Sequence, residues 1–246
     1  MEKQLKLDTK KDVIKYGIAE YNKKCKESVF KYIKEWEALT ERMGFWLDMK
    51  DPYITYENYF MESVWWSLKT LGDRGLIYKG HKVVPFCPSC GTPLSTHEVA
   101  LGYQNVKEET VYVKFRMLDQ ENTYILAWTT TPWTLLSNVA LAANGDGRYA
   151  LVKYEDANYI VATALIPNVF KENYEIVKEF MGSDLLYQKY EPLFPYFADL
   201  KDKNAFIVVN ADYVDTELKA DNISTGFVHI ACAFGEDDYN VGIEYD

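Results

Sequence analysis

Residues 128–135 place three consecutive threonines between two tryptophans, with Pro132 before the second one. Threonine hydroxyls donate and accept hydrogen bonds without carrying charge, and an indole ring offers a flat stacking face with one donor. The apolar run 124–127 predicts a strand, so the hydroxyls are expected at the end of that strand, where Pro132 stops the ladder. Hydrogen bonding to a ligand and a buried strand edge without function are both compatible with this spacing.

A second segment, residues 225–238, ends a strand-like run in His229 and passes through a glycine-containing turn into Glu236, Asp237 and Asp238. Three like charges crowded after a strand repel one another, so a compensating group is expected nearby. We predict a solvated acidic turn for Glu236 and Asp237. A cationic group of a ligand is the alternative for one of the three acids.

Together the two segments resemble the editing domain, inserted as a connective polypeptide, of the class I isoleucyl-tRNA synthetases. That family carries Trp-Thr-Thr-Thr-Pro-Trp-Thr-Leu at this place, and residues 128–135 reproduce it. Leucyl and valyl relatives usually have an arginine after two threonines, where this chain has Thr131. The resemblance runs from about residue 18 to residue 246. An editing domain of a valyl or leucyl enzyme is the alternative, and Thr131 argues against it.

The resemblance implies hydrolysis of valyl-tRNA(Ile), and of valyl-adenylate, at a site that receives the 3′ end of tRNA(Ile) and the valine moiety. No Ser-His-Asp arrangement is apparent, which favours a positioned water over a covalent route. The residues implied as catalytic are Thr130, Thr131 and Asp238, the last holding the α-ammonium group. The residues implied in substrate binding are Thr129, Trp133, Asn138 and His229.

Selectivity in such a site follows from size. Isoleucine exceeds valine by one methylene, worth about 1–3 kcal/mol in an apolar pocket, a figure established on this very family of enzymes. A second, smaller pocket admits valine and refuses isoleucine, and the resemblance gives His229 the place of a pocket wall. A fragment that binds the tRNA 3′ end without hydrolysing the ester is the alternative.

The family's two nucleotide-site signatures, His-Ile-Gly-His and Lys-Met-Ser-Lys-Ser, do not occur in this sequence. We therefore expect no aminoacylation by these residues. The resemblance implies ATP and magnesium only for a catalytic domain outside them, with the rest of the synthetase as a partner. Editing itself is expected to need no cofactor.

Cys87 and Cys90 form a C-x-x-C pair with the spacing of a zinc knuckle, followed by Gly91. Zinc takes four ligands, so the pair is half a site, and His81 and His97 are the nearest further candidates. In the resembled family a second cysteine pair follows the editing domain, which implies zinc in the full-length protein. Two free thiols in a loop are the alternative, and a redox role is weaker because no βαβ pattern surrounds the motif.

The composition limits the kind of partner. A net charge of −10 argues against a module that binds the nucleic-acid backbone on its own. It is compatible with receiving a short single-stranded end by stacking and hydrogen bonds. The sequence has neither a bilayer-length apolar run nor an apolar signal core at its start, and the cysteines are few, so we predict a cytoplasmic protein.

The predicted fold is α+β in three parts: helices in 1–80 belonging to the synthetase body, a knuckle-like connector in 81–105, and a truncated β-barrel editing domain in 106–246. Apolar residues at helical spacing predict one helix through 29–43, ended by Gly44, and a second through 61–71, ended by Gly75, with Thr55 as its cap. A third helix, 8–25, is expected to break at Gly17. Strands are predicted at 111–117, 150–154, 158–162, 206–209 and 226–231, with a short helix at 164–171.

Overall fold

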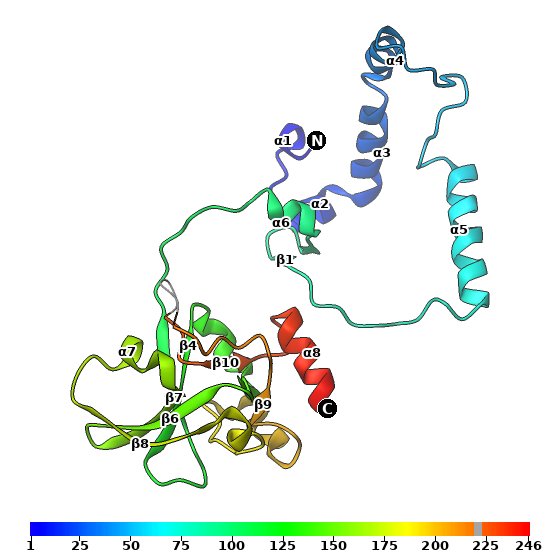
Figure 1. Cartoon of the computed structure of the whole chain (residues 1–246). Coiled ribbons are helices and arrows are strands. Elements are labelled where there is room, and N and C mark those ends of the chain that lie inside the picture. The colour runs from blue at the N-terminus through cyan, green and yellow to red at the C-terminus, as the bar shows by residue number, and fades with distance from the viewer. Residues whose placement is uncertain (219–222) are drawn as a thin grey trace. The chain divides into compact units, whose positions relative to one another are not determined.

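The chain divides into two units, Met1–Leu101 and Gly102–Asp246, in a computed structural model that describes residues 1–218 and 223–246 (Figure 1). The boundary between the units lies close to the predicted end of the connector. The finer division of the first unit at residue 80 stays a prediction.

The first unit is helical through residue 73, as the apolar periodicity predicts. Gly17, with φ of 109°, separates two helices at the predicted break. Gly44 and Gly75 follow helix ends with φ of 76° and 69°, which glycine adopts without strain. The helices are α1 (Glu2–Leu5), α2 (Lys10–Tyr16), α3 (Ile18–Val29), α4 (Ile33–Arg42) and α5 (Asn58–Asp73).

Two details of the helix prediction were wrong. The stripe through 29–43 is divided, because Val29 ends α3 and the chain leaves helical geometry before Ile33 begins α4. This stretch, Val-Phe-Lys-Tyr-Ile, is rich in β-branched and aromatic residues of low helix propensity. The helix α5 starts after Glu57, not after Thr55, and Glu57 makes no side-chain capping bond.

The connector contains more structure than predicted. Strands β1 (Phe86–Cys87) and β2 (Thr92–Pro93) pair antiparallel around the cysteines, with Gly91 at φ of 68° in the turn. A further helix, α6 (Thr96–Ala100), begins in a capping box in which Ser95 and Glu98 bond each other's backbone N–H groups.

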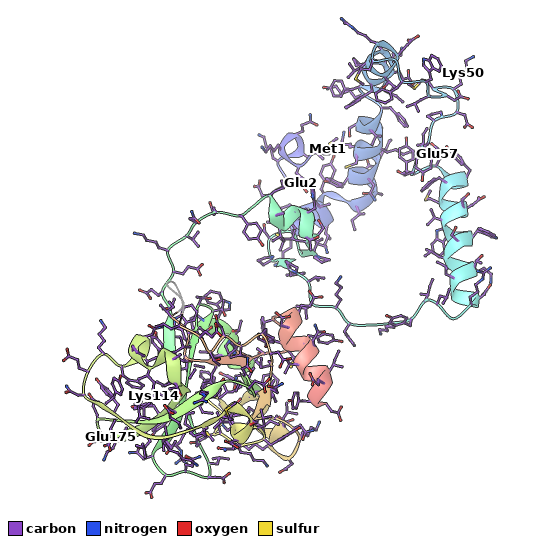
Figure 2. All side chains as sticks on the ribbon, in the orientation of Figure 1. Met1, Glu2, Lys50, Glu57, Lys114 and Glu175 are labelled. Atoms are coloured by element: carbon purple, nitrogen blue, oxygen red, sulfur yellow. The ribbon has the colours of Figure 1, made fainter. Side chains whose placement is uncertain are left out.

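No residue of the first unit, all of which is described, is buried. Most of the apolar side chains of helix α5 are exposed, and Trp65 and Trp66 are 73% and 70% exposed. Figure 2 shows side chains projecting from α5 on several sides. The apolar face of a helix normally packs against another element. Because the first unit has no buried residue, the hydrophobic core lies in the second unit.

The second unit contains a five-stranded sheet in the order β3-β4-β7-β6-β8. Strand β4 pairs antiparallel with β3 and parallel with β7. The predicted strands at 150–154 and 158–162 correspond to β6 and β7, which form a hairpin around Glu155, whose φ is 53°. The strands are β3 (Val111–Arg116), β4 (Thr123–Thr129), β6 (Arg148–Tyr154), β7 (Ala157–Ala162) and β8 (Tyr174–Met181).

A three-stranded sheet, β10-β5-β9, completes the β structure. Strand β5 (Ala140–Ala143) pairs antiparallel with β10 (Phe227–Ile230) and parallel with β9 (Ile207–Asn210), so that His229 lies opposite Leu141. The remaining elements are η1 (Pro132–Ser137), η2 (Thr163–Leu165), α7 (Ile166–Val169), η3 (Gly182–Leu185), η4 (Pro195–Asp202) and α8 (Glu236–Tyr245).

The predicted β-barrel is not closed in the described part of the chain. The two sheets are joined by single-residue bridges, Met117 to Tyr190 and Lys189 to Ile207, instead of a continuous ladder. Tyr187 and Phe206, beside the bridge residues Lys189 and Ile207, have φ of 65° and 57°, which is outside the range of a regular strand. The mixed α and β content was predicted correctly, and the closure was not.

Two clusters of buried side chains lie on the two faces of the three-stranded sheet. Phe227 and Leu141 belong to the main core, which also includes residues from β3, β4, β6 and β7. Ile230 and Ala140 belong to the second cluster, with Val241 of α8. Because strand residues alternate between faces, His229 lies on the face of Phe227.

Candidate functional site

The threonines form a loop that folds back on itself where β4 ends. The backbone N–H of Thr131 donates to Thr129 Oγ1 at 3.0 Å, and the Thr134 hydroxyl donates to the Thr131 carbonyl at 2.8 Å. Pro132 begins η1, where its missing N–H is harmless. Thr129 and Thr134 are buried and Thr130 is exposed. The loop thus keeps two hydroxyls inside and turns one out.

His229 joins this loop across 95 residues of sequence, because its Nε2 lies 2.9 Å from Thr134 Oγ1. The single proton of the Thr134 hydroxyl already goes to the Thr131 carbonyl. The histidine must therefore donate from Nε2, which leaves Nδ1 as an unprotonated acceptor. That Nδ1 is buried and has no hydrogen-bond partner among the described residues. Burial also lowers the pKa of His229, so the ring is neutral at pH 7.

Asp238 lies in a helix instead of the predicted acidic turn. Glu236, Asp237 and Asp238 form the first turn of α8, where three carboxylates face the positive end of the helix dipole. This dipole offsets part of the repulsion among the three carboxylates, which the sequence interpretation expected solvent or a ligand cation to offset. Asp238 also accepts the backbone N–H of Ala231 at 2.9 Å, which ties α8 to the end of β10.

The surroundings of Asp238 are partly dry. Burial raises the pKa of Asp238, the Ala231 N–H opposes the rise, and the charge of Asp237 adds to it. Burial together with the charges of Asp238 and Asp237 raises the pKa of Tyr213 to about 12. The fold thus holds the Asp238 carboxylate where its charged form is less favoured than in water.

Two residues predicted to bind substrate differ sharply in environment. Trp133, in η1, is 61% exposed, so its indole is free to stack on a ligand. Asn138 is only 5% exposed, and its amide bonds the Ala140 carbonyl and the Tyr190 hydroxyl inside the protein. The geometry favours a ligand-facing place for Trp133 and an internal one for Asn138.

The structure brings together Thr129, Thr131 and His229 through Thr134, a residue that the sequence interpretation left without a role. Its place in the Trp-Thr-Thr-Thr-Pro-Trp-Thr-Leu segment was the only available signal, because nothing in a sequence shows a contact across 95 residues. No hydrogen bond links Asp238 to these four residues in the described part of the chain.

A cavity of about 430 Å³ lies on the other face of the three-stranded sheet. Its lining includes Ala140 and Ile230 of the sheet, Cys232, and Val241 and Tyr245 of α8. Because Ile230 and His229 point to opposite faces, this cavity is separate from the threonine loop.

The cysteine pair supplies only part of a metal site. The Cys90 backbone N–H donates to Cys87 Sγ at 3.3 Å and, with the Cys90 thiol, lowers the pKa of Cys87. A lowered pKa favours the thiolate that binds zinc. No group of three or more metal-binding side chains occurs among the described residues. The residues present therefore fit half of a four-ligand zinc site and not a whole one.

We accordingly expect zinc to be absent or sub-stoichiometric in this chain. Two ligands leave the ion open to water and to exchange. Elemental analysis after dialysis against zinc-free buffer measures the content, with a Cys87→Ser, Cys90→Ser variant as the blank. One tightly held zinc ion per chain would contradict the expectation and show that His81, His97 or a second chain completes the site.

The chain matches the family model described as tRNA synthetases class I (I, L, M and V) over residues 1–223. It therefore belongs to the class I tRNA synthetases of that group. Within the group it is homologous to a region of isoleucine–tRNA ligase. It is 50% identical over 246 residues to the enzyme of Clostridium novyi and 51% identical over 246 residues to that of Clostridium acetobutylicum. All of this chain is matched, and it spans 23% of the length of each relative.

Two solved structures were compared with the chain. The GlLeuRS-CP1 crystal structure gives a TM-score of 0.43 at 21% identity, covering 54% of this chain and 58% of that one. The P. knowlesi cytosolic leucyl-tRNA synthetase editing domain gives 0.40 at 15% identity, covering 54% and 59%. Both TM-scores lie below 0.5 and are too low to establish a shared fold. None of the helices within 1–218 and 223–246 has the length and hydropathy needed to cross a membrane.

Proposed function

We propose that the second unit hydrolyses the ester of valyl-tRNA(Ile), and also valyl-adenylate, and so removes valine attached in error. The observation that carries the proposal is the hydrogen bond between Thr134 and His229. It joins the loop of residues 129–134 to strand β10, which carries His229. These belong to the two segments, 128–135 and 225–238, on which the editing resemblance rests. Both segments belong to this chain, all of which is homologous to a region of isoleucine–tRNA ligase.

The proposed chemistry needs a positioned water and donors for the oxyanion that develops on the ester carbonyl. Thr130 is an exposed residue and Thr131 a partly exposed one, and the Thr131 hydroxyl also lies 3.2 Å from Thr129 Oγ1. They would orient the water, while Thr129 and Trp133 would hold the terminal adenosine. Hydroxyl groups suit this task because they donate and accept without charge.

Asp238 would hold the α-ammonium group of the amino acid. Burial raises the pKa of this carboxyl, so its ionised form is less favoured than in water and gains from a nearby cation. An ammonium group from the substrate would restore the balance and supply a charge-assisted hydrogen bond. His229 would form the wall of the pocket that receives the valine side chain.

Deacylation assays test the proposal directly. Valyl-tRNA(Ile) should lose valine faster with the protein than without it, and isoleucyl-tRNA(Ile) should be hydrolysed much more slowly. A Thr131→Val variant keeps the side-chain shape, removes the hydroxyl and serves as the matched control. Binding of the tRNA 3′ end without hydrolysis would identify a silent binding fragment instead. Preference for threonyl-tRNA(Val) would identify a valyl-type site.

The whole synthetase would supply what this chain does not contain. We propose tRNA(Ile) and the rest of the synthetase as partners, since this chain spans 23% of its relatives. ATP and magnesium would serve only the catalytic domain, and zinc would need ligands beyond Cys87 and Cys90. Hydrolysis of the ester itself would require no cofactor.

A further inference from the structure

The side chain of Asn138 is engaged entirely inside the protein. Its Nδ2 donates to the Ala140 carbonyl at 2.9 Å, and its Oδ1 accepts the Tyr190 hydroxyl at 2.7 Å. Both ends of the amide are thus in use, and the residue is 5% exposed. One N–H and one lone pair of the amide remain, but the low exposure of the residue keeps them largely out of reach of a ligand.

Tyr190 is rigidly held. It is fully buried, with its ring edge-on to Phe115 at 5.3 Å and to Phe206 at 6.1 Å between centroids. Its backbone N–H donates to the Phe206 carbonyl at 3.0 Å. Burial raises the pKa of Tyr190 well above its usual 10, so the hydroxyl stays protonated and keeps donating to Asn138. Aromatic packing of this kind fixes the direction of the hydroxyl.

Asn138 closes the far end of η1, the short helix that carries Trp133 and Thr134. Its backbone N–H donates to the Leu135 carbonyl at 3.1 Å. The near end of η1 is held by Thr134, which bonds both Thr131 and His229. The 3-10 turn between these ends has poorer hydrogen-bond geometry than an α-helix. Its placement therefore depends on both attachments.

We infer that Asn138 and Tyr190 are positioning residues of the editing site: the Tyr190 hydroxyl fixes Asn138, Asn138 fixes η1, and η1 places Thr134 against His229. Neither residue contacts the substrate. This assigns Asn138 a role different from substrate binding. The inference rests on the proposed function for its effect on selectivity, but its effect on η1 can be measured without hydrolysis.

A Tyr190→Phe variant tests the inference, because it removes one hydroxyl and keeps the ring packing. We expect amide hydrogen exchange at Thr134 and Asn138 to become about tenfold faster, since a buried acceptor loses its donor. The ratio of valyl- to isoleucyl-tRNA(Ile) hydrolysis should fall about fivefold, because a loosened pocket wall discriminates less well. A mere loss of folded protein would lower both rates equally and leave the ratio unchanged.

Tyr149→Phe is the matched control. Tyr149 is also fully buried, and its hydroxyl donates to the Gly226 carbonyl and accepts the Asn144 N–H, away from η1. It should leave exchange at Thr134 and the hydrolysis ratio unchanged. Asn138→Ala should reproduce the Tyr190→Phe effects, and the double variant should add nothing to Asn138→Ala.

Unchanged exchange at Thr134 and Asn138 in Tyr190→Phe would overturn the inference, and so would an equal effect of Tyr149→Phe. If the wild-type protein does not hydrolyse valyl-tRNA(Ile), the proposed function fails. The exchange measurement then still decides whether Tyr190 and Asn138 position η1.

Discussion

Replacing Asp238 by alanine is expected to slow hydrolysis of valyl-tRNA(Ile) by roughly ten- to a hundred-fold. The carboxylate would lose a charge-assisted hydrogen bond to the α-ammonium group, worth about 1.5–3 kcal/mol, and each 1.36 kcal/mol is a factor of ten in rate. Deacylation rates of wild type and variant under single-turnover conditions measure the effect. Asp237→Ala and Glu236→Ala should change the rate far less, because both side chains are exposed.

Alanine also removes a structural contact, since Asp238 accepts the Ala231 N–H. Asp238→Asn separates the two effects, because the amide oxygen can still accept that N–H while the charge is gone. The asparagine variant should therefore melt like the wild type but hydrolyse as poorly as the alanine variant. Full activity in Asp238→Asn would show that the carboxylate only holds α8, and a loss confined to Asp237→Ala would show that the wrong acid was assigned.

The pH dependence of stability gives a further check on Asp238. Its pKa in the folded state is raised above the ordinary value of 3.8, so protonation favours folding. The stabilisation is full below the unfolded pKa and is lost as pH rises through the folded one. At pH 7 none of it remains, and Asp238→Asn should be at least as stable as the wild type there. Thermal melts at pH 4 and pH 7 measure this effect. Relative to Asp238→Asn, the wild type should be more stable at pH 4 than it is at pH 7.

The strands that carry the site could be predicted because they bury one face. Alternation marks β3, and the hairpin of β6 and β7 is marked by polar turn residues. Strand β8 was missed because Lys178 and the adjacent pair Ile176 and Val177 blur the alternation of its sequence, Tyr-Glu-Ile-Val-Lys-Glu-Phe-Met, and nearly all of its residues are exposed. Helix α8 was missed because its three acids were taken as a turn, although acids are also favoured in a first helical turn.

Arrangement in space was the harder part. Short strands with polar turns suit both open sheets and closed barrels, and positive φ angles at Tyr187 and Phe206 flank the bridges where a continuous ladder would have to run. The threonines and His229 were predicted from residue types and a family resemblance, yet Thr134, which joins them, was not. For Asn138 the sequence motif predicts a place in the site but cannot show that its amide also bonds Ala140 and Tyr190 inside the protein.

Replacing His229 by alanine is expected to weaken the discrimination between valine and isoleucine more than hydrolysis itself. The ring is neutral because burial lowers its pKa, and Nε2 is held by Thr134. The nitrogen free to take a proton, Nδ1, is buried, so a role as general base toward a bulk water is disfavoured. The ring is suited instead to limit the volume of the pocket.

Removing that wall should let the extra methylene of isoleucine enter. One methylene corresponds to about ten- to two-hundred-fold in discrimination, so hydrolysis of isoleucyl-tRNA(Ile) should rise by at least about tenfold, while that of valyl-tRNA(Ile) stays within roughly threefold. The ratio of the two rates is the measurement, because loss of folded protein cancels from it. Thr134→Val keeps the volume of Thr134 but releases the ring, and should give an intermediate ratio. Two rates that collapse together with their ratio unchanged would instead place His229 in the chemical step.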